Sequence, residues 1–216
     1  MKRVIAETSV KVLVDAVRLD GVLSIPPNPK GIVLVVQANG TEASRLRVPL
    51  IASALHEEGL ATLAFSLLNV EEKKEDVLTR ELRFNIPLLS HRLLESLKWI
   101  SSQEELASLE FAFLAKGTAV AAALCAAAEL KEKVKGVICV AGRPDLAGGA
   151  LQKVQAHTLL IVGSEDHGVI EINEKAFGRL LCEKKLAIVN GAGHRFEEPG
   201  TLEEVGHLSA EWLSSI

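Results

Sequence analysis

The sequence of 216 residues predicts a single α/β domain built on a mostly parallel, doubly wound β-sheet with helices on both faces. Nearly half of the residues are hydrophobic (48%) but only 4% are aromatic, so the predicted core is aliphatic. Such a composition suits a sheet that helices cover on both sides. From residue 31 onward, short apolar segments alternate with helical ones, as expected for parallel strands joined by helices. No repeat or linker divides the chain, so residues 1–216 are interpreted as one domain.

About eight strands are expected, each from a short run rich in apolar residues. They cover residues 10–14, 17–25, 31–36, 60–65, 109–114, 135–140, 157–162 and 185–189. The first two precede a proline-rich turn at 26–29, and we expect them to form an antiparallel pair at one edge of the sheet. The segment 31–36 is a continuous apolar run, which is typical of a strand buried on both sides.

Helices are predicted between these strands, where apolar residues recur every three to four positions. The expected ranges are 44–58, 83–103, 118–130, 146–154, 169–181 and 201–214. Gly59 follows the first of them, in the position where glycine often ends a helix. The charged run at 71–76 (EEKKED) is interpreted as a loop, and no large lid domain is expected.

Charge and composition argue against several classes of protein. The formal net charge is −4 and no basic block occurs, so a nucleic-acid partner is not expected. No apolar stretch is as long as a membrane span and no signal peptide is evident, so we expect a cytoplasmic protein without a membrane partner. Cys125, Cys139 and Cys182 are not spaced as metal ligands. We expect them to be reduced and mostly buried, with no metal and no cofactor.

Two loops carry residues that are typical of hydrolytic chemistry. In an open parallel sheet, the active site lies beyond the carboxyl ends of the strands. Asp166 follows the strand at 157–162, and His194 lies in a glycine-rich loop after the strand at 185–189. An acid and then a histidine, in this order, match the later two members of a Ser…Asp…His triad. Taken singly, Asp166 is equally well explained as a turn or helix-capping residue and His194 as an ordinary loop histidine.

The loop after the strand at 109–114 is where the G-x-S-x-G motif of a nucleophile elbow would stand, and it reads AKGTA (115–119). From about residue 9 onward, the chain resembles the dienelactone-hydrolase-like branch of the α/β-hydrolase superfamily. The resemblance is strongest in RFNIPLL (83–89), AGRPDLAG (141–148), TLLIVG (158–163) and GHRFEEPG (193–200). It implies an α/β-hydrolase fold, with Asp166 as the acid and His194 as the general base.

The same resemblance places Gly117 at the nucleophile position, between Ala115 and Ala119 in place of the two glycines. An elbow strains a residue that has a side chain by on the order of 1–3 kcal/mol, and glycine avoids this cost. The segment is therefore interpreted as a turn that has kept its shape and lost its catalytic serine.

Other positions of the family pattern differ as well. The His-Gly pair that usually follows the third strand reads Gln37-Ala38, and the acidic residue often found after the fourth strand reads Ser66. Together with Lys116 and Thr118, Gln37 and Ala38 are the expected lining of the cleft.

Two functions remain open at this point. In the first, the chain is a binding or regulatory protein that holds a small-molecule ligand in the inherited cleft. In the second, it hydrolyses small esters, lactones or thioesters, either with water activated by Asp166 and His194 or with a displaced nucleophile. Thr118, Cys139 and Ser66 are candidates for that nucleophile, although each has a simpler structural explanation. A monomer and a homodimer are both compatible with the sequence.

Overall fold

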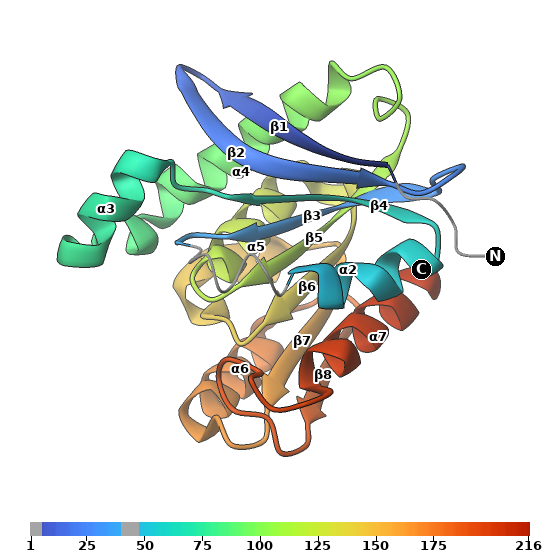
Figure 1. The fold of residues 1–216 in the computed structure, drawn as a ribbon. Helices are drawn as coiled ribbons and strands as arrows, with labels where there is room; N and C mark the ends of the chain where they lie inside the picture. The colour runs from blue at the N-terminus through green and yellow to red at the C-terminus, as the bar shows by residue number, and fades with distance from the viewer. Residues whose placement is uncertain (1–5, 40–47) are drawn as a thin grey trace.

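The computed structural model describes residues 6–39 and 48–216, which form one eight-stranded sheet flanked by helices (Figure 1). The strands are β1 (Ala6–Val14), β2 (Val17–Ile25), β3 (Gly31–Gln37), β4 (Leu60–Ser66), β5 (Glu110–Lys116), β6 (Val134–Val140), β7 (His157–Gly163) and β8 (Lys184–Val189). Their order across the sheet is β1-β2-β4-β3-β5-β6-β7-β8. β1 pairs antiparallel with β2 and β2 with β4, whereas all the other pairs are parallel. The predicted fold class, including the antiparallel pair at one edge, is confirmed.

The helices of the described residues are α2 (Val48–Glu57), α3 (Val70–Thr79), α4 (Ile86–Ser101), α5 (Ala119–Leu130), α6 (His167–Arg179) and α7 (Thr201–Ser214). Three 3₁₀ segments join them: η1 (Leu82–Phe84), η2 (Lys131–Lys133) and η3 (Pro144–Lys153). The helix predicted at 44–58 is present from residue 48, and its expected first four residues lie outside the described part of the chain. The helix predicted at 146–154 is a kinked 3₁₀ segment instead. None of the described helices combines the length and the apolar character needed to span a bilayer.

The prediction of a loop at 71–76 is wrong, because this charged run forms most of α3. Asn69 starts the helix with a capping box: its side chain accepts a hydrogen bond from the backbone N–H of Glu72 at 2.9 Å. The Glu72 side chain in turn accepts from the backbone N–H of Asn69, also at 2.9 Å. These two bonds satisfy backbone donors that a helix start otherwise leaves unpaired. The helix ends at Arg80, whose left-handed backbone (φ 59°) stops it.

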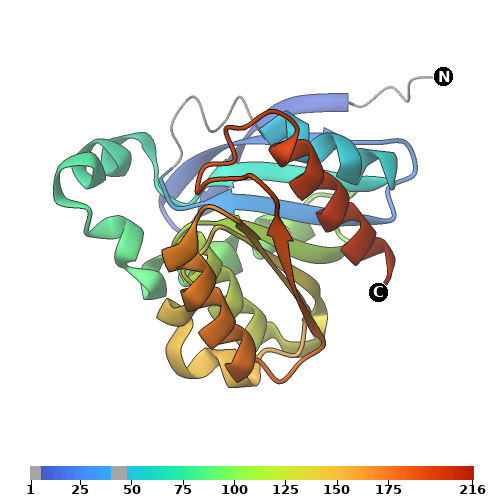
Figure 2. The same ribbon diagram turned by 90° about the horizontal axis from the view of Figure 1, so that it is seen from below.

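Helices cover both faces of the sheet, and the strands alternate their side chains between them (Figure 2). On β3, Ile32 and Leu34 pack in the cluster that includes α4 and α5, whereas Val33 packs in the cluster that includes α2 and α7. Because both faces are buried, a parallel strand needs a continuous apolar sequence, and this explains why 31–36 was recognisable.

The carboxyl ends of the central strands meet at one edge of the sheet. Gln37, the last residue of β3, is in register with Ser66 at the end of β4 and with Lys116 at the end of β5. The chain adds β4 on one side of β3 and then returns to add β5 on the other side. Ligands of doubly wound folds bind in the crevice at such a reversal. The first residues after β3 (Ala38 and Asn39) and the turn after β5 lie at this crevice.

Candidate active site

The structure brings together the acid and the histidine that the sequence singles out. Nδ1 of His194 lies 2.7 Å from Oδ2 of Asp166. An ionised carboxylate only accepts hydrogen bonds, so Nδ1 donates and Nε2 is the atom left to accept a proton. Asp166 stands at the start of α6, but its side chain makes no capping bond there. The alternative reading of Asp166 as a helix cap is therefore wrong: its carboxylate is engaged by the histidine.

The two loops that carry this pair are held against each other by backbone contacts. The N–H of Ser164 donates to the carbonyl of Val189 at 2.9 Å, and the N–H of Glu165 donates to that of Ala192 at 3.0 Å. Gly163 makes this approach possible, because a Cβ at that position would lie 2.1 Å from the carbonyl oxygen of Ala192. The side chain of Asp166 is consequently only 15% exposed, whereas that of His194 is 56% exposed and faces solvent or a ligand.

Gly117 lies in the sharp turn between β5 and α5, where an α/β-hydrolase presents its nucleophile. Its backbone is left-handed (φ 65°), a conformation that glycine adopts without steric cost. Among the described residues, chain neighbours aside, no atom lies within 4 Å of a Cβ built on Gly117. Two hydrogen bonds fix the turn: the N–H of Gly117 donates to the Val140 carbonyl at 3.3 Å, and the N–H of Arg143 donates to the Gly117 carbonyl at 3.1 Å. The turn is thus well supported, and space for a side chain remains.

Thr118 lies between this turn and the start of α5. It is the residue before the first turn of the helix, is half-buried, and its hydroxyl makes no capping bond. Within the described residues, no backbone carbonyl accepts from its N–H. The first N–H groups of a helix point outward and carry a partial positive charge. This N–H can therefore serve as a donor to an oxygen atom bound above Gly117.

Lys116 connects the elbow turn with the histidine loop. Its Nζ donates to the carbonyl of Arg195 at 3.3 Å and lies 5.7 Å from the ring centroid of the buried Phe196. Whether Lys116 also lines the cleft stays a prediction from the sequence. On the other side of the crevice, Gln37 is half-buried at the end of β3 and Ala38 is buried.

Two of the three candidate displaced nucleophiles, Cys139 and Ser66, lie in the interior. Cys139 is fully buried in the layer beneath α5, and burial raises the pKa of its thiol far above the usual range. The thiol is therefore protonated and inaccessible, and its interpretation as a core residue is correct. Ser66 is buried as well, and its hydroxyl donates to the carbonyl of Ala38 at 2.9 Å. Its role is to hold the end of β4 against the loop after β3.

All three cysteines are free thiols, but only Cys139 is buried; Cys125 and Cys182 are partly exposed. Both of these thiols pack against the core at its margin, in line with the expectation of reduced, mostly buried cysteines. Among residues 6–39 and 48–216, no group of three or more His, Cys, Asp or Glu side chains is arranged around a common point, as a metal site would require.

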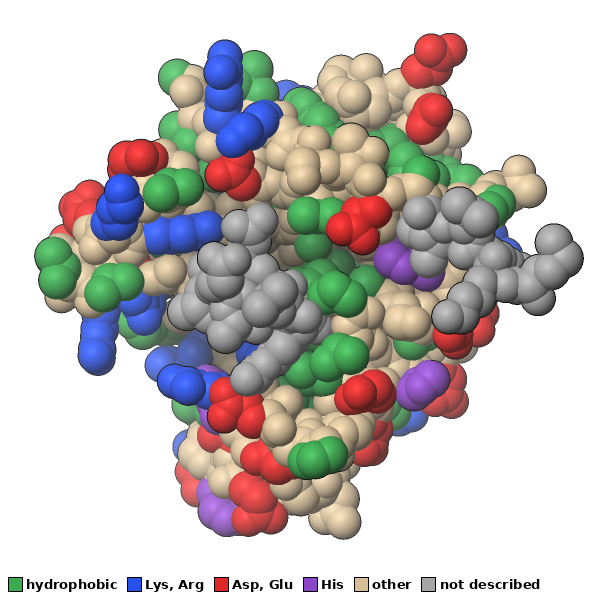
Figure 3. All heavy atoms as spheres, viewed as in Figure 1, with side chains coloured by type: hydrophobic (Ala, Val, Ile, Leu, Met, Phe, Trp, Pro, Cys, Tyr) green, Lys and Arg blue, Asp and Glu red, His purple; other side chains and the backbone are tan. Residues whose placement is uncertain are grey.

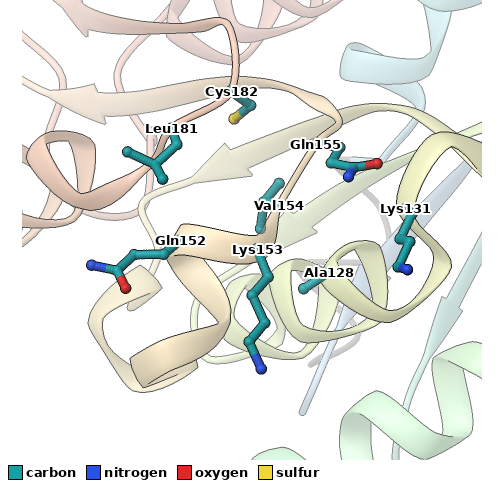
Figure 4. Close-up of a pocket in the computed structure, with 8 residues that line it drawn as sticks. All are labelled: Ala128, Lys131, Gln152, Lys153, Val154, Gln155, Leu181 and Cys182. Atoms are coloured by element: carbon teal, nitrogen blue, oxygen red, sulfur yellow. The ribbon is translucent and has the colours of Figure 1, made fainter.

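A pocket of about 550 Å³ lies far from this site, at the opposite edge of the sheet (Figure 4). It is bounded by the end of α5, the end of η3 and the segment before β8, with Lys131, Val154 and Cys182 among its lining residues. The labelled side chains point in different directions rather than toward one point. This depression does not add a residue to the candidate site.

Comparison with known proteins supports the fold described above. The chain is similar to a dienelactone hydrolase from Anabaena variabilis: the two are 42% identical, the match covers 98% of each chain, and the TM-score is 0.91. It also resembles the esterase domain of a Rhodothermus marinus protein, at 17% identity, with 96% and 97% of the two chains covered and a TM-score of 0.75. At this low identity the second match shows the fold alone.

Curated relatives give a different description. The chain is 39% identical over 207 residues to a Mycobacterium tuberculosis protein named "Putative phosphoribosyl transferase". The match covers 96% of this chain but 46% of that protein, so the chain spans about half the length of the curated relatives it matches. No protein-family model matches the chain.

Proposed function

Because the chain belongs to the dienelactone hydrolase family of the α/β-hydrolases, we propose that it uses the family's cleft to bind a small carbonyl compound without forming an acyl-enzyme. The observation that carries this proposal is Gly117, which has no side chain in the turn that would present the nucleophile. Acyl transfer through a covalent intermediate needs an oxygen or sulfur atom at that point. The retained shape of the turn supports binding, and the missing atom removes the covalent step.

The groups around the turn define the chemistry of the ligand. Nε2 of His194 can accept a hydrogen bond from a hydroxyl group, or donate one to a carboxylate when the ring is protonated. The N–H of Thr118 supplies a donor for a carbonyl or carboxylate oxygen. Since no described atom beyond its chain neighbours lies within 4 Å of a Cβ built on Gly117, the part of the chain that the structure describes leaves room there for an atom of the ligand. Small lactones, esters and carboxylic acids carry these groups in a compact form.

A second candidate function is hydrolysis by a water molecule that His194 activates directly. The observation in its favour is the 2.7 Å hydrogen bond to Asp166, which orients the imidazole and leaves Nε2 as the atom that can accept a proton. General-base catalysis of this kind contributes about 10²- to 10⁴-fold to a rate. If the two residues had no function, nothing would require both of them to be present in this geometry.

Phosphoribosyl transfer, which the name of the mycobacterial relatives states, is not proposed for this chain. The chain spans less than half of those proteins, so the named activity is not tied to the part that it matches. Its similarity to a dienelactone hydrolase extends over the full length of both chains instead.

A panel of p-nitrophenyl esters and small lactones tests the proposal with the wild type, a His194→Ala variant and a His207→Ala control. His207 is exposed on α7 and belongs to no part of the site. We expect no turnover by any of the three. We also expect at least one lactone or its hydroxy acid to raise the melting temperature of the wild type and the control more than that of His194→Ala. Turnover that only His194→Ala abolishes would overturn the proposal in favour of water activation.

A further inference from the structure

Helix α3 has a charged side toward the domain, unlike an ordinary surface helix. A surface helix buries an apolar stripe and exposes its polar side. Of the ten residues of α3, all of which the structure describes, only Asp76 is buried. Glu72, one turn earlier, also faces the domain, so the inward side of this helix is charged.

Ion pairs and hydrogen bonds fix the inward side in place. Asp76 accepts from the backbone N–H of Arg83 at 2.9 Å, from Arg83 Nε at 2.6 Å and from Asn39 Nδ2 at 2.8 Å. Glu72 forms a two-point ion pair with the buried Arg92 at 2.6 and 2.5 Å. Arg92 also donates to the carbonyl of Leu67 at 2.7 Å. These contacts specify one orientation of α3, so its exposed side is a defined feature of the fold.

The exposed side carries apolar residues that the domain does not use. Val70, Val77 and Leu78 of α3 are 46%, 65% and 84% exposed, and Phe84 of the adjoining η1 is 49% exposed. Four of the nine large hydrophobic side chains found exposed in the described part of the chain are therefore on this one segment of 15 residues, 70–84. Figure 1 shows α3 projecting beyond the sheet, and in Figure 3 the same region carries green side chains among red and blue ones. We call these four residues and the charges between them the α3 face.

The charges of the α3 face alternate in sign. Lys74 and Arg80 are exposed next to Glu71, Glu75 and Glu81. A face with both signs is complementary to a copy of itself, because a two-fold axis can place the bases of one copy against the acids of the other. A partner of a single charge sign would meet repulsion from part of the face. With a formal net charge of −4, repulsion between two whole chains is small.

We propose that the α3 face is a two-fold dimer interface between two copies of this chain. Contiguous apolar side chains rimmed by charged residues are the usual anatomy of a protein–protein contact. The contact is built on one ten-residue helix and a 3₁₀ turn, so its area is small and the dimer is weak and concentration-dependent. This inference is independent of the proposed function, since no residue of the cleft takes part in it.

Sedimentation velocity over about 10 µM to 1 mM protein tests the apolar part of the interface. We expect the wild type to shift from monomer toward dimer over this range, and Leu78→Asp to remain monomeric at every concentration. Leu181→Asp is the matched control: Leu181 is 75% exposed but lies before β8, and this variant should dimerise as the wild type does. A wild type that is monomeric at every concentration, or a dimer that Leu78→Asp leaves unchanged, would overturn the proposal.

A charge-reversal pair tests whether the partner is a second copy. Lys74→Glu makes the α3 face mainly acidic, and the double variant Glu71→Lys/Glu75→Lys makes it mainly basic. We expect each variant alone to dissociate and an equimolar mixture to form a heterodimer, because the faces are then complementary again. Circular dichroism of each variant checks that the fold is unchanged. If the mixture stays monomeric while the wild type dimerises, the self-complementary arrangement is wrong.

Discussion

The two sides of the cleft each contain a glycine, and the two glycines are present for different structural reasons. Gly163, on the side of the acid and the histidine, is required by space, since a Cβ would lie 2.1 Å from a backbone oxygen of Ala192. Gly117, on the side of the elbow, has no described atom within 4 Å of an added Cβ apart from its chain neighbours, and its left-handed backbone is what favours glycine there. The first glycine holds Asp166 and His194 together. The second occupies a position where the fold itself does not forbid a side chain.

This difference distinguishes the residues that the fold requires from those that the reaction requires. The loops after β7 and β8 keep both their backbone contacts and their functional side chains. The turn after β5 keeps its backbone hydrogen bonds to Val140 and Arg143 but has no reactive atom. A nucleophile can thus be lost without disturbing the rest of the site, and the same reasoning predicts that one can be put back.

The largest expected effect is a gain of reactivity in Gly117→Ser. The serine would supply the oxygen that the elbow turn lacks, with His194 in the role of general base as in the α/β-hydrolase triad. We expect labelling by a fluorophosphonate probe to rise from none to a large fraction of the protein. Ester hydrolysis should exceed that of the wild type by at least about 10²-fold. The left-handed backbone costs a serine about 1–2 kcal/mol of stability. Gly200→Ser is the matched control: Gly200 also has a left-handed backbone (φ 82°) and no described atom within 4 Å of an added Cβ apart from its chain neighbours, so this variant should lose stability and gain no labelling.

A second substitution in the Gly117→Ser background tests the retained pair. Adding His194→Ala removes the general base, and we expect the acquired hydrolysis to fall by about 10²- to 10⁴-fold. The rate should be measured under single-turnover conditions, so that acylation is observed directly. An unchanged rate would show that the serine is activated by some other group and that the pair is a relic.

The steric role of Gly163 predicts a loss of stability rather than of chemistry alone. Gly163→Ala forces the two loops apart, and we expect the free energy of unfolding to fall by about 1–3 kcal/mol. Gly168→Ala, in the first turn of α6 with no atom near its Cβ, should be neutral or slightly stabilising. Urea denaturation of the two variants measures the contrast. Equal stability of both would mean that the loops do not need their close approach.

The smallest effect concerns Asp76, which joins α3 to Arg83 and to Asn39, the second residue after β3. Burial alone would raise the pKa of this carboxyl group, but hydrogen bonds from Arg83 and Asn39 outweigh it and leave the pKa below the usual value. A depressed pKa in the folded state adds stability above about pH 4 that is lost as the pH falls through the folded pKa. We expect Asp76→Asn to cost about 1–2 kcal/mol at pH 7 and less as the pH is lowered below 4. Unfolding curves of wild type and variant across pH 3–7 provide the test; a difference that is constant with pH would contradict it.

The central sheet could be read from the sequence because a strand buried on both faces needs an unbroken apolar run. Helix α3 could not be recognised in this way, since its inward contacts are made by Glu72 and Asp76 rather than by an apolar stripe. The one local signal was Asn69 followed three residues later by Glu72, the spacing of a capping box. A hydrophobic periodicity identifies a helix only when burial of apolar side chains holds that helix in place.

Some features of the candidate site were predictable from the sequence and others were not. The order of Asp166 and His194 along the chain, after neighbouring strands, was enough to predict their contact. The steric requirement at Gly163 and the bond between Arg143 and Gly117 were not predictable, because they join segments far apart in sequence. The burial of Cys139 was predicted, and its depth in the core follows from the face of β6 on which it lies.

The most direct test of the central claim is the intact mass of the wild-type protein after incubation with an activated ester and with a fluorophosphonate. Without a nucleophile at position 117, we predict that the mass stays that of the unmodified chain under conditions in which Gly117→Ser gains an adduct. An adduct on the wild type that disappears in His194→Ala would show that another residue in the cleft forms the covalent intermediate, and the proposed function would then be wrong.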